Sequence, residues 1–233
     1  MKKVRKSYLL IIIVLGVLNS CADTEDTEKT MQRTWSGSDW SEYLGGPDRN
    51  HYSILTQIDA SNVDQLEVAW QYSTLDTGQI QSNPLIVDGV LYSMTATTEP
   101  FALNAATGQE YWRKDTDSLD QFNTSRGLVY WEEGDDRRIL YTHGEWLHAV
   151  NAATGEDIPS FGNDGRVSLK AGLGETAENK MVLSNTPGTV YGDLIIMPLR
   201  VSEGSDAALG HIQAFNIKSG ELEWVFHTIP QPG

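Results

Sequence analysis

The segment Phe101-Ala-Leu-Asn-Ala-Ala-Thr-Gly-Gln-Glu-Tyr-Trp112 decides the fold, because the chain repeats it twice. It returns as Leu147-His-Ala-Val-Asn-Ala-Ala-Thr-Gly-Glu156 and again as Ile212-Gln-Ala-Phe-Asn-Ile-Lys-Ser-Gly-Glu-Leu-Glu-Trp224. Each copy reads as an apolar strand, an Asn, a three-residue spacer, a Gly and a second strand, which is the pattern of a β-hairpin. An internal repeat of this kind determines the architecture before any other signal does.

The spacing of the repeat indicates a β-propeller. Its anchors Asn104, Asn151 and Asn216 lie 47 and 65 residues apart, and a four-stranded propeller blade takes roughly 40–50 residues. The first spacing fits one blade, and the second fits one blade plus an insertion. We therefore predict an all-β fold of about three four-stranded antiparallel blades. Propellers typically have about four to eight blades, so the chain is either an open array or the front of a longer protein.

The repeat also predicts its own turn chemistry. An Asn at a strand end can accept a hydrogen bond from the backbone two residues on. Gly108, Gly155 and Gly220 follow four residues after the Asn, where a positive φ favours glycine. Trp112 and Trp224 offer large apolar surfaces, and we expect them to pack between blades rather than to contact a ligand.

The rest of the globular part reads as strands and turns. Asp88-Gly89 between two apolar runs is a strong hairpin signal. The segment 157–180 is rich in Gly and Asp without clear periodicity and is predicted to be a loop. Besides the repeat hairpins, strands are predicted in the segments 68–72, 83–92, 127–131, 138–142, 146–150, 189–191, 194–199 and 221–227.

The amino terminus is predicted to be an export signal with a lipid anchor. Residues 1–21 begin with four basic residues, continue with an apolar run too short for a membrane span, and end at Cys21. Cys21 is the one cysteine of the chain and follows Leu18-Asn-Ser20, which resembles a bacterial lipobox. Lipidation of Cys21 is therefore favoured over a free cysteine at the end of an ordinary signal. Residues 22–34 are polar and acidic and are predicted to be a disordered tether.

Charge excludes one class of function. The signal carries four of the 17 basic residues, so the mature chain holds 13 basic against 32 acidic residues, a net charge of −19. This balance argues against nucleic acid and against electrostatic binding to anionic membrane.

Several motifs resemble pyrroloquinoline-quinone (PQQ) dehydrogenases. The Asn, Ser/Thr-Gly and Trp spacing is similar to their tryptophan-docking repeat, and residues 40–70, Gly210–Phe215 and Phe226–Gly233 resemble the glucose-dehydrogenase-like branch. The resemblance covers residues 35–233 and implies about three blades of an eight-bladed ring that holds PQQ and Ca²⁺ on its axis. It further implies an enzyme that oxidises a sugar or alcohol and passes electrons to a respiratory quinone or cytochrome, and the predicted signal and Cys21 would place this enzyme outside the cytoplasm, anchored to a membrane.

The resemblance also implies roles for individual residues. Arg126 matches an arginine that grips a carboxylate or the quinone oxygens, for which the planar guanidinium fork is suited. Glu203 matches an acidic Ca²⁺ ligand, since this hard cation prefers carboxylate oxygen. Gln81, Thr142 and Thr186 match residues that contact the cofactor.

Other positions depart from the family pattern or leave it incomplete. Phe122 stands where relatives carry a histidine or half of a vicinal disulfide, and no Asp sits in a motif that matches the general base. We therefore assign no catalytic residue from the sequence.

Two alternatives remain open at this stage. One is a non-enzymatic lipoprotein propeller that scaffolds other proteins, as in outer-membrane assembly factors with the same repeat. The other is a non-functional remnant of a truncated gene. Arg126 and Glu203 favour the enzyme, because a scaffold has no need of an arginine and an acid in those motifs.

Overall fold

A computed structural model describes residues 39–116 and 124–230 of the chain. The predicted signal with Cys21, the predicted tether 22–34 and Phe122 all lie outside the described residues, so those predictions remain untested. Within the described part, no helix is long and apolar enough to cross a membrane.

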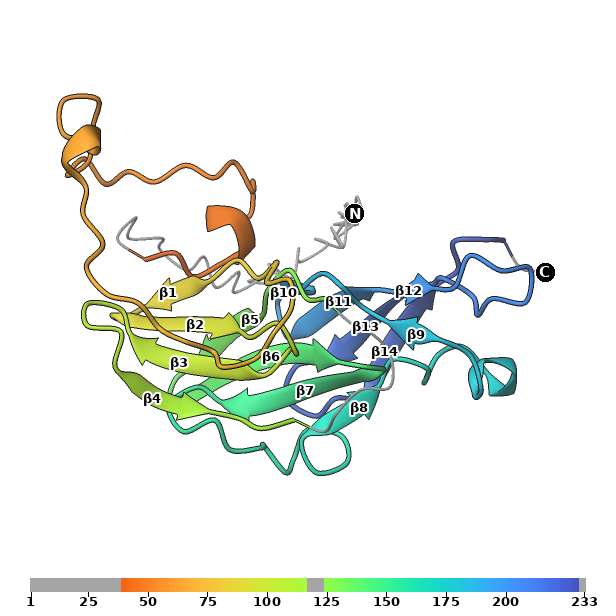
Figure 1. The fold of residues 1–233 in the computed structure, drawn as a ribbon. Helices are drawn as coiled ribbons and strands as arrows, with labels where there is room; N and C mark the ends of the chain where they lie inside the picture. The colour runs from red at the N-terminus through yellow and green to blue at the C-terminus, as the bar shows by residue number, and fades with distance from the viewer. Residues whose placement is uncertain (1–38, 117–123, 231–233) are drawn as a thin grey trace, which may run out of the picture. The chain divides into compact units, whose positions relative to one another are not determined.

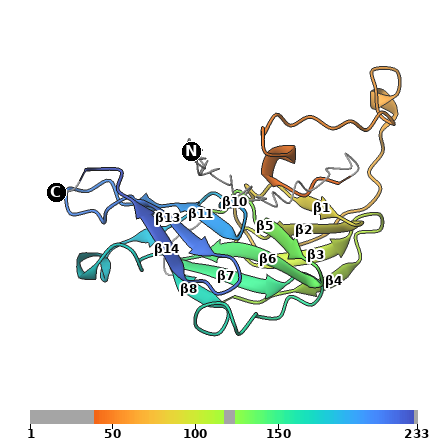
Figure 2. The ribbon, with the colours of Figure 1, turned by 180° about the vertical axis from the view of Figure 1, so that it is seen from behind.

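The fold consists of three four-stranded antiparallel sheets (Figures 1 and 2), as the repeat predicted. The strands of each sheet follow one another in chain order, as in a meander. The first sheet comprises β1 (Leu85–Val87), β2 (Val90–Met94), β3 (Pro100–Asn104) and β4 (Glu110–Arg113). The second comprises β5 (Val129–Glu133), β6 (Asp136–His143), β7 (Trp146–Asn151) and β8 (Arg166–Ser168), and the third β10 (Thr189–Tyr191), β11 (Leu194–Pro198), β13 (Ile212–Asn216) and β14 (Leu222–Phe226).

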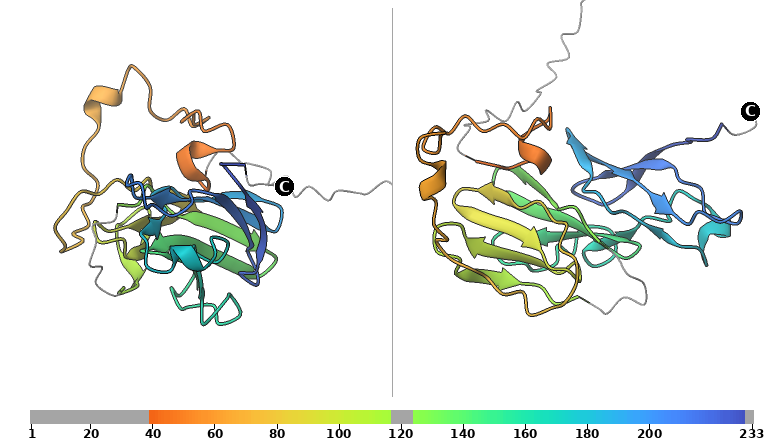
Figure 3. Two further views of the ribbon diagram at one scale, coloured as in Figure 1. Left: turned by 90° about the vertical axis from the view of Figure 1, so that its right-hand side faces the viewer. Right: turned by 45° about the horizontal axis from the view of Figure 1, so that its top comes forward.

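Smaller elements join the sheets. Two short strands, β9 (Val182–Leu183) and β12 (Arg200–Val201), pair antiparallel beside the third sheet. Three single turns of 3₁₀-helix are η1 (Tyr43–Gly45), η2 (Val63–Gln65) and η3 (Glu175–Ala177). Figure 3 shows that the segment between η1 and β1 runs away from the first sheet and returns to it.

The second sheet is buried on both faces because its strands alternate between two cores. Ile139 and Tyr141 point into a cluster shared with the first sheet, where Leu85 and Trp112 lie. Leu140, between them in β6, belongs to a second cluster that is shared with the third sheet. Successive side chains of a strand point to opposite faces. The apolar run of β6 therefore reflects a sheet packed between two others.

The first and third repeat hairpins occupy equivalent places, which confirms the architecture expected from the sequence, whereas in the second copy the strand that pairs with β7 begins only at Arg166. Trp112 lies opposite Ala102 across β3 and β4, and the register shifts at the next residue of β3. In β13 and β14, Trp224 lies opposite Ala214, and the register shifts at the same point.

The Asn of each repeat forms the expected turn. Asn151 Oδ1 accepts hydrogen bonds from the amides of Ala153 (2.8 Å) and Thr154 (3.2 Å), while its carbonyl accepts from the Gly155 amide at 2.8 Å. The side chains of Asn104 and Asn216 make the same pair of bonds. The Gly that follows has φ of +71° to +75° in all three copies, as predicted.

One tryptophan docks on the glycine of the following sheet. A Cβ at Gly155 would lie 2.6 Å from Trp112 Cε3, and Trp112 Nε1 donates to the Ala152 carbonyl at 3.0 Å. The ring of Trp112 therefore needs the open side of a glycine in the next sheet. Gly220 of the third sheet is approached instead by Val167 Cγ1, to 2.7 Å from its virtual Cβ, so an aliphatic side chain takes this place at the second interface.

The segment Val68–Tyr72 is not the strand that the sequence predicted. It has no ladder partner among the described residues, and Val68 is 75% exposed. Yet Trp70 meets Gly108 as Trp112 meets Gly155, with the virtual Cβ of Gly108 2.6 Å from Trp70 Cε3. Trp70 Nε1 also donates to the Ala105 carbonyl at 3.2 Å. Against the first sheet, the segment therefore occupies the place that β4 occupies against the second sheet, although it is not itself paired in a sheet.

The predicted loop 157–180 also differs from expectation, because it contains β8. Arg166–Ser168 is only three residues long and partly buried, so it leaves no strand pattern in the sequence. It pairs with β7 and completes the second sheet.

Candidate functional site

The segments that precede the first strand of each sheet are joined in a row. The Asn83 amide donates to the Arg126 carbonyl at 2.9 Å, and the Arg126 amide donates to the Asn185 carbonyl at 2.8 Å. Asn83 Nδ2 adds a second bond to the Arg126 carbonyl at 3.1 Å. These residues lie just before β1, β5 and β10. The backbone itself therefore brings segments 43 and 59 residues apart to one place.

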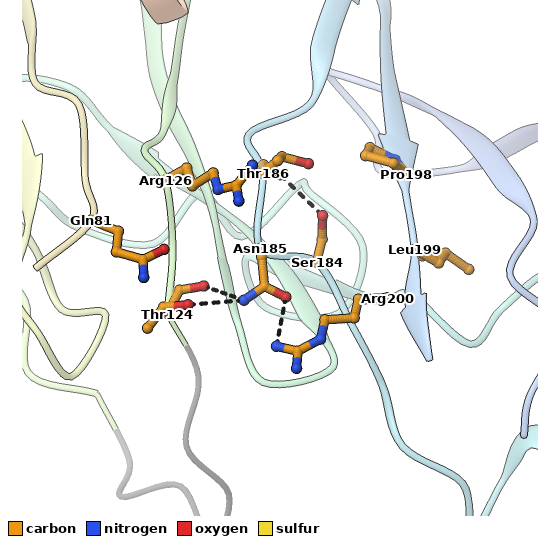
Figure 4. A pocket seen from close by; sticks show the side chains of 9 residues that line it. All are labelled: Gln81, Thr124, Arg126, Ser184, Asn185, Thr186, Pro198, Leu199 and Arg200. Carbon is orange, nitrogen blue, oxygen red and sulfur yellow. Dashed lines mark hydrogen bonds between the residues drawn. The ribbon is translucent and has the colours of Figure 1, made fainter. Parts of the chain in front are cut away.

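A cavity of about 330 Å³ opens on this row (Figure 4). Two arginines line it and no acidic residue does, although acidic residues outnumber basic ones almost two to one in the chain. Its lining consists of Gln81, Thr124, Arg126, Ser184, Asn185, Thr186, Pro198, Leu199 and Arg200. A pocket of this composition suits an anionic ligand that accepts several hydrogen bonds.

Arg126 presents a guanidinium to the cavity. The side chain is exposed, and among the described residues it makes no hydrogen bond or ion pair, whereas its backbone is held on both sides by the row. Gly127 follows with a φ of +149°, and a Cβ there would come 3.2 Å from the Asn83 carbonyl oxygen. A fixed backbone with an uncommitted guanidinium can bind a carboxylate in bidentate fashion.

Asn185 links the row to a second arginine. Its Nδ2 donates to the Thr124 carbonyl (2.7 Å) and approaches Thr124 Oγ1 (3.1 Å). Its Oδ1 accepts a hydrogen bond from Arg200 Nη1 at 3.2 Å, and Figure 4 shows this chain of contacts. Arg200 begins β12, opposite Leu183 of β9. The short ribbon therefore places Arg200 beside the segment that follows β9.

Three of the five predicted cofactor and metal residues meet at this cavity. Gln81, Arg126 and Thr186 all line it. Thr142 does not: it is buried, and its hydroxyl donates to the Ser184 carbonyl at 3.0 Å, so it supports the wall of the cavity from behind. Glu203 is exposed in the loop after β12 and is not among the lining residues.

Among residues 39–116 and 124–230, no three His, Cys, Asp or Glu side chains gather closely enough to hold a metal ion. Glu203 would be a single carboxylate ligand there. Its metal role stays a prediction from the resemblance.

Sequence reasoning missed Asn185, Thr124 and Arg200, although a signal for Asn185 was present. A Ser followed by Asn or Arg precedes the first strand of every sheet, as Ser82-Asn83, Ser125-Arg126 and Ser184-Asn185. The second residue of each pair is the one that the backbone row connects. Arg200 has no such signal, because β9 and β12 pair residues 17 and 19 positions apart in a non-local antiparallel ladder that no local sequence pattern predicts.

Comparison with known protein families gives the identity of the fold. The profile of the PQQ glucose/ethanol/alcohol dehydrogenase β-propeller domain matches residues 40–233. The chain belongs to this family. The finding confirms the resemblance noted in the sequence and the propeller fold.

The curated relatives are much longer than this chain. It is 31% identical over 219 residues to the dehydrogenase subunit of a quinone alcohol dehydrogenase from Gluconobacter oxydans, with 89% of this chain and 27% of that protein aligned. It is 30% identical over 214 residues to the quinoprotein glucose dehydrogenase of Escherichia coli, covering 81% and 27% respectively. The chain thus spans about a quarter of the length of these relatives.

Solved structures support the fold alone. A quinohemoprotein alcohol dehydrogenase from Pseudomonas putida HK5 aligns with a TM-score of 0.69 at 22% identity, over 83% of this chain and 27% of that one. The corresponding enzyme from Comamonas testosteroni aligns with a TM-score of 0.67 at 22% identity, over 83% and 28%.

Proposed function

We propose that this chain supplies the amino-terminal blades of a PQQ-dependent dehydrogenase that oxidises a sugar or an alcohol. Its part in that enzyme is to hold the anionic side of the quinone at the cavity lined by Arg126. Bound PQQ would carry the two-electron oxidation chemistry, and the protein would supply orientation and charge. The electrons would pass on to a respiratory quinone or cytochrome.

The observation that carries this proposal is the guanidinium of Arg126 in a cavity without acids. The row Asn83–Arg126–Asn185 fixes its backbone, and Gln81 and Thr186 add polar groups to the same lining. Family membership favours a dehydrogenase over the scaffold alternative, and a basic cavity supports the same choice. A glucose-like substrate is proposed from the resemblance of individual motifs to the glucose-dehydrogenase branch.

Titration of the apo-protein with PQQ tests the role of Arg126. In the natural polypeptide that carries this sequence, Arg126→Ala should weaken binding about 30- to 100-fold, because a charge-assisted bidentate contact is lost. Arg137→Ala is a matched control, since Arg137 is 52% exposed at the β5–β6 turn and pairs with Asp88 and Glu132. Equal affinity of Arg126→Ala and wild type would remove the proposal for this residue.

The isolated 233-residue chain is expected not to oxidise aldoses or alcohols, even with PQQ and Ca²⁺ added. A ring encloses its ligand from all sides, whereas three sheets supply part of the contacts. Turnover by the isolated chain in a dye-reduction assay would contradict this expectation.

Export and anchoring through Cys21 are part of the same proposal. Mass spectrometry of the mature amino terminus should find a diacylglycerol-modified cysteine. A mature protein that begins at another residue would contradict it.

A further inference from the structure

Arg200 has no role in the function proposed so far, although its side chain lines the same cavity as Arg126. An arginine carries five N–H donors, and the described contacts use one of them, from Nη1 to Asn185 Oδ1. The other donors remain for a ligand. The cavity therefore offers a ligand two guanidinium groups rather than one.

The orientation of Arg200 is built into the site. The Asn185 amide is engaged at both ends, with Thr124 on its nitrogen and Arg200 on its oxygen. The Asn185 carbonyl also accepts from the Arg126 amide. One residue therefore ties the backbone of one arginine to the side chain of the other. Figure 4 shows Arg200 hydrogen-bonded to Asn185, while the Arg126 side chain lies beside Thr186.

The two arginines come from independent parts of the fold. Arg126 precedes β5 of the second sheet, whereas Arg200 begins β12, outside the three main sheets. Two forks held by separate elements can each bind a carboxylate of one rigid, planar ligand, and such bidentate pairing is geometrically selective. A single carboxylate would leave one fork unused.

We propose that Arg200 is a second anion-binding residue of this cavity and that Asn185 is its positioning residue. The ligand class is a planar molecule that bears at least two carboxylates, which the Arg126 and Arg200 forks hold at separate points. The identification of that ligand as the quinone rests on the proposed function. The two-arginine grip itself rests on the contacts of Asn185.

The test is equilibrium binding of two probes, PQQ and benzene-1,3,5-tricarboxylate, to the natural polypeptide. Arg200→Ala should weaken PQQ binding about 10- to 100-fold, and the effects of Arg126→Ala and Arg200→Ala should multiply if the forks hold different carboxylates. Arg200→Lys should recover only part of the loss, because an ammonium lacks the fork. Asn185→Ala should weaken binding less than Arg200→Ala, and Arg137→Ala should not change it.

Two further readouts separate binding from folding. The thermal unfolding midpoint of Arg200→Ala should equal that of wild type, since the side chain is exposed. The dependence of PQQ affinity on salt should be shallower in Arg200→Ala, because one charged contact is missing. A lower midpoint with unchanged salt dependence would show a structural role and overturn the proposal.

The outcomes distinguish this inference from the proposed function. If Arg126→Ala weakens PQQ binding and Arg200→Ala does not, the two-arginine grip is wrong and the proposed function stands. If PQQ does not bind but the tricarboxylate binds in an Arg200-dependent way, the grip stands and the proposed function fails. If neither probe binds wild type, both are overturned.

Discussion

The same repeat builds two very different surfaces, the interface between the first and second sheets and the outer face of the third. At the interface, Trp112 is 8% exposed and docks on Gly155 of the next sheet. At the outer face, Trp224 occupies the matching position opposite an alanine but is 39% exposed, and Phe226 beside it is 59% exposed. The repeat therefore places a tryptophan at the same position in both hairpins. This tryptophan stabilises the fold only where a neighbouring sheet packs against it.

This difference explains how stability is distributed in the described part. The second sheet contributes one face to the core shared with the first sheet and the other face to the core shared with the third sheet, as β6 does with Ile139 and Leu140. Stability in such an array is approximately a sum of intrinsic and nearest-neighbour contributions. The three predictions that follow measure the neighbour contribution.

Removing each tryptophan should give the largest contrast. Trp112→Ala should lower the free energy of unfolding by about 3–5 kcal/mol, as expected for a large buried aromatic side chain. Trp224→Ala should lower it by less than about 1 kcal/mol, because exposed substitutions away from special features cost little. Urea unfolding followed by far-ultraviolet circular dichroism measures both. Equal losses would break the comparison and would show that the outer face of the third sheet is covered in solution.

The second prediction separates docking from backbone strain at glycine. Gly155 and Gly192 both have positive φ, +73° and +58°, but only Gly155 faces a ring, while a Cβ at Gly192 would meet nothing within 4 Å. Gly192→Ala should cost about 1 kcal/mol through φ alone. Gly155→Ala should cost about 3 kcal/mol, because displacement of Trp112 adds an overpacking penalty. Similar losses in urea unfolding would mean that φ, not the tryptophan, makes Gly155 necessary.

The sequence predicted the part of this fold that repeats. Asn104, Asn151 and Asn216 form the turns that their side chains favour, because the interaction is local and spans three residues. The segment Val68–Tyr72 has the composition of a strand, yet a strand requires a partner, and composition does not reveal whether one is present. The residues of the site likewise divide into those that a local motif predicts and those that a non-local pairing places. Arg126 lies in a recognisable motif, whereas Arg200 reaches the cavity through the non-local β9–β12 pairing, which no local pattern encodes.

The third prediction tests the covered interface by its response to pH. His148 in β7 stacks on Tyr141 with ring centroids 4.9 Å apart, and its Nε2 is buried without a partner among the described residues. Burial, assisted by repulsion from His143, lowers the pKa of His148 from 6.5 to about 4. Asp157 opposes this lowering of the pKa, whereas Arg166 and Lys114 add to it.

The direction of the change in the free energy of unfolding with pH follows from whether the folded or the unfolded chain binds the proton at the higher pH. The unfolded chain binds a proton at His148 near pH 6.5 and the folded chain near pH 4, so the free energy of unfolding falls as the pH falls between these values. Between pH 7 and pH 5 the loss should be about 2 kcal/mol, since one pKa unit corresponds to about 1.4 kcal/mol. The informative variant is His148→Gln, which introduces the residue that the third sheet carries at the matching position, Gln213. Urea unfolding at pH 7 and pH 5 should show a smaller loss in the variant than in wild type, by about the same 2 kcal/mol. Because every other titrating group is shared, an identical loss in both proteins would show that His148 is solvated, and hence that the first interface is as open as the outer face of the third sheet.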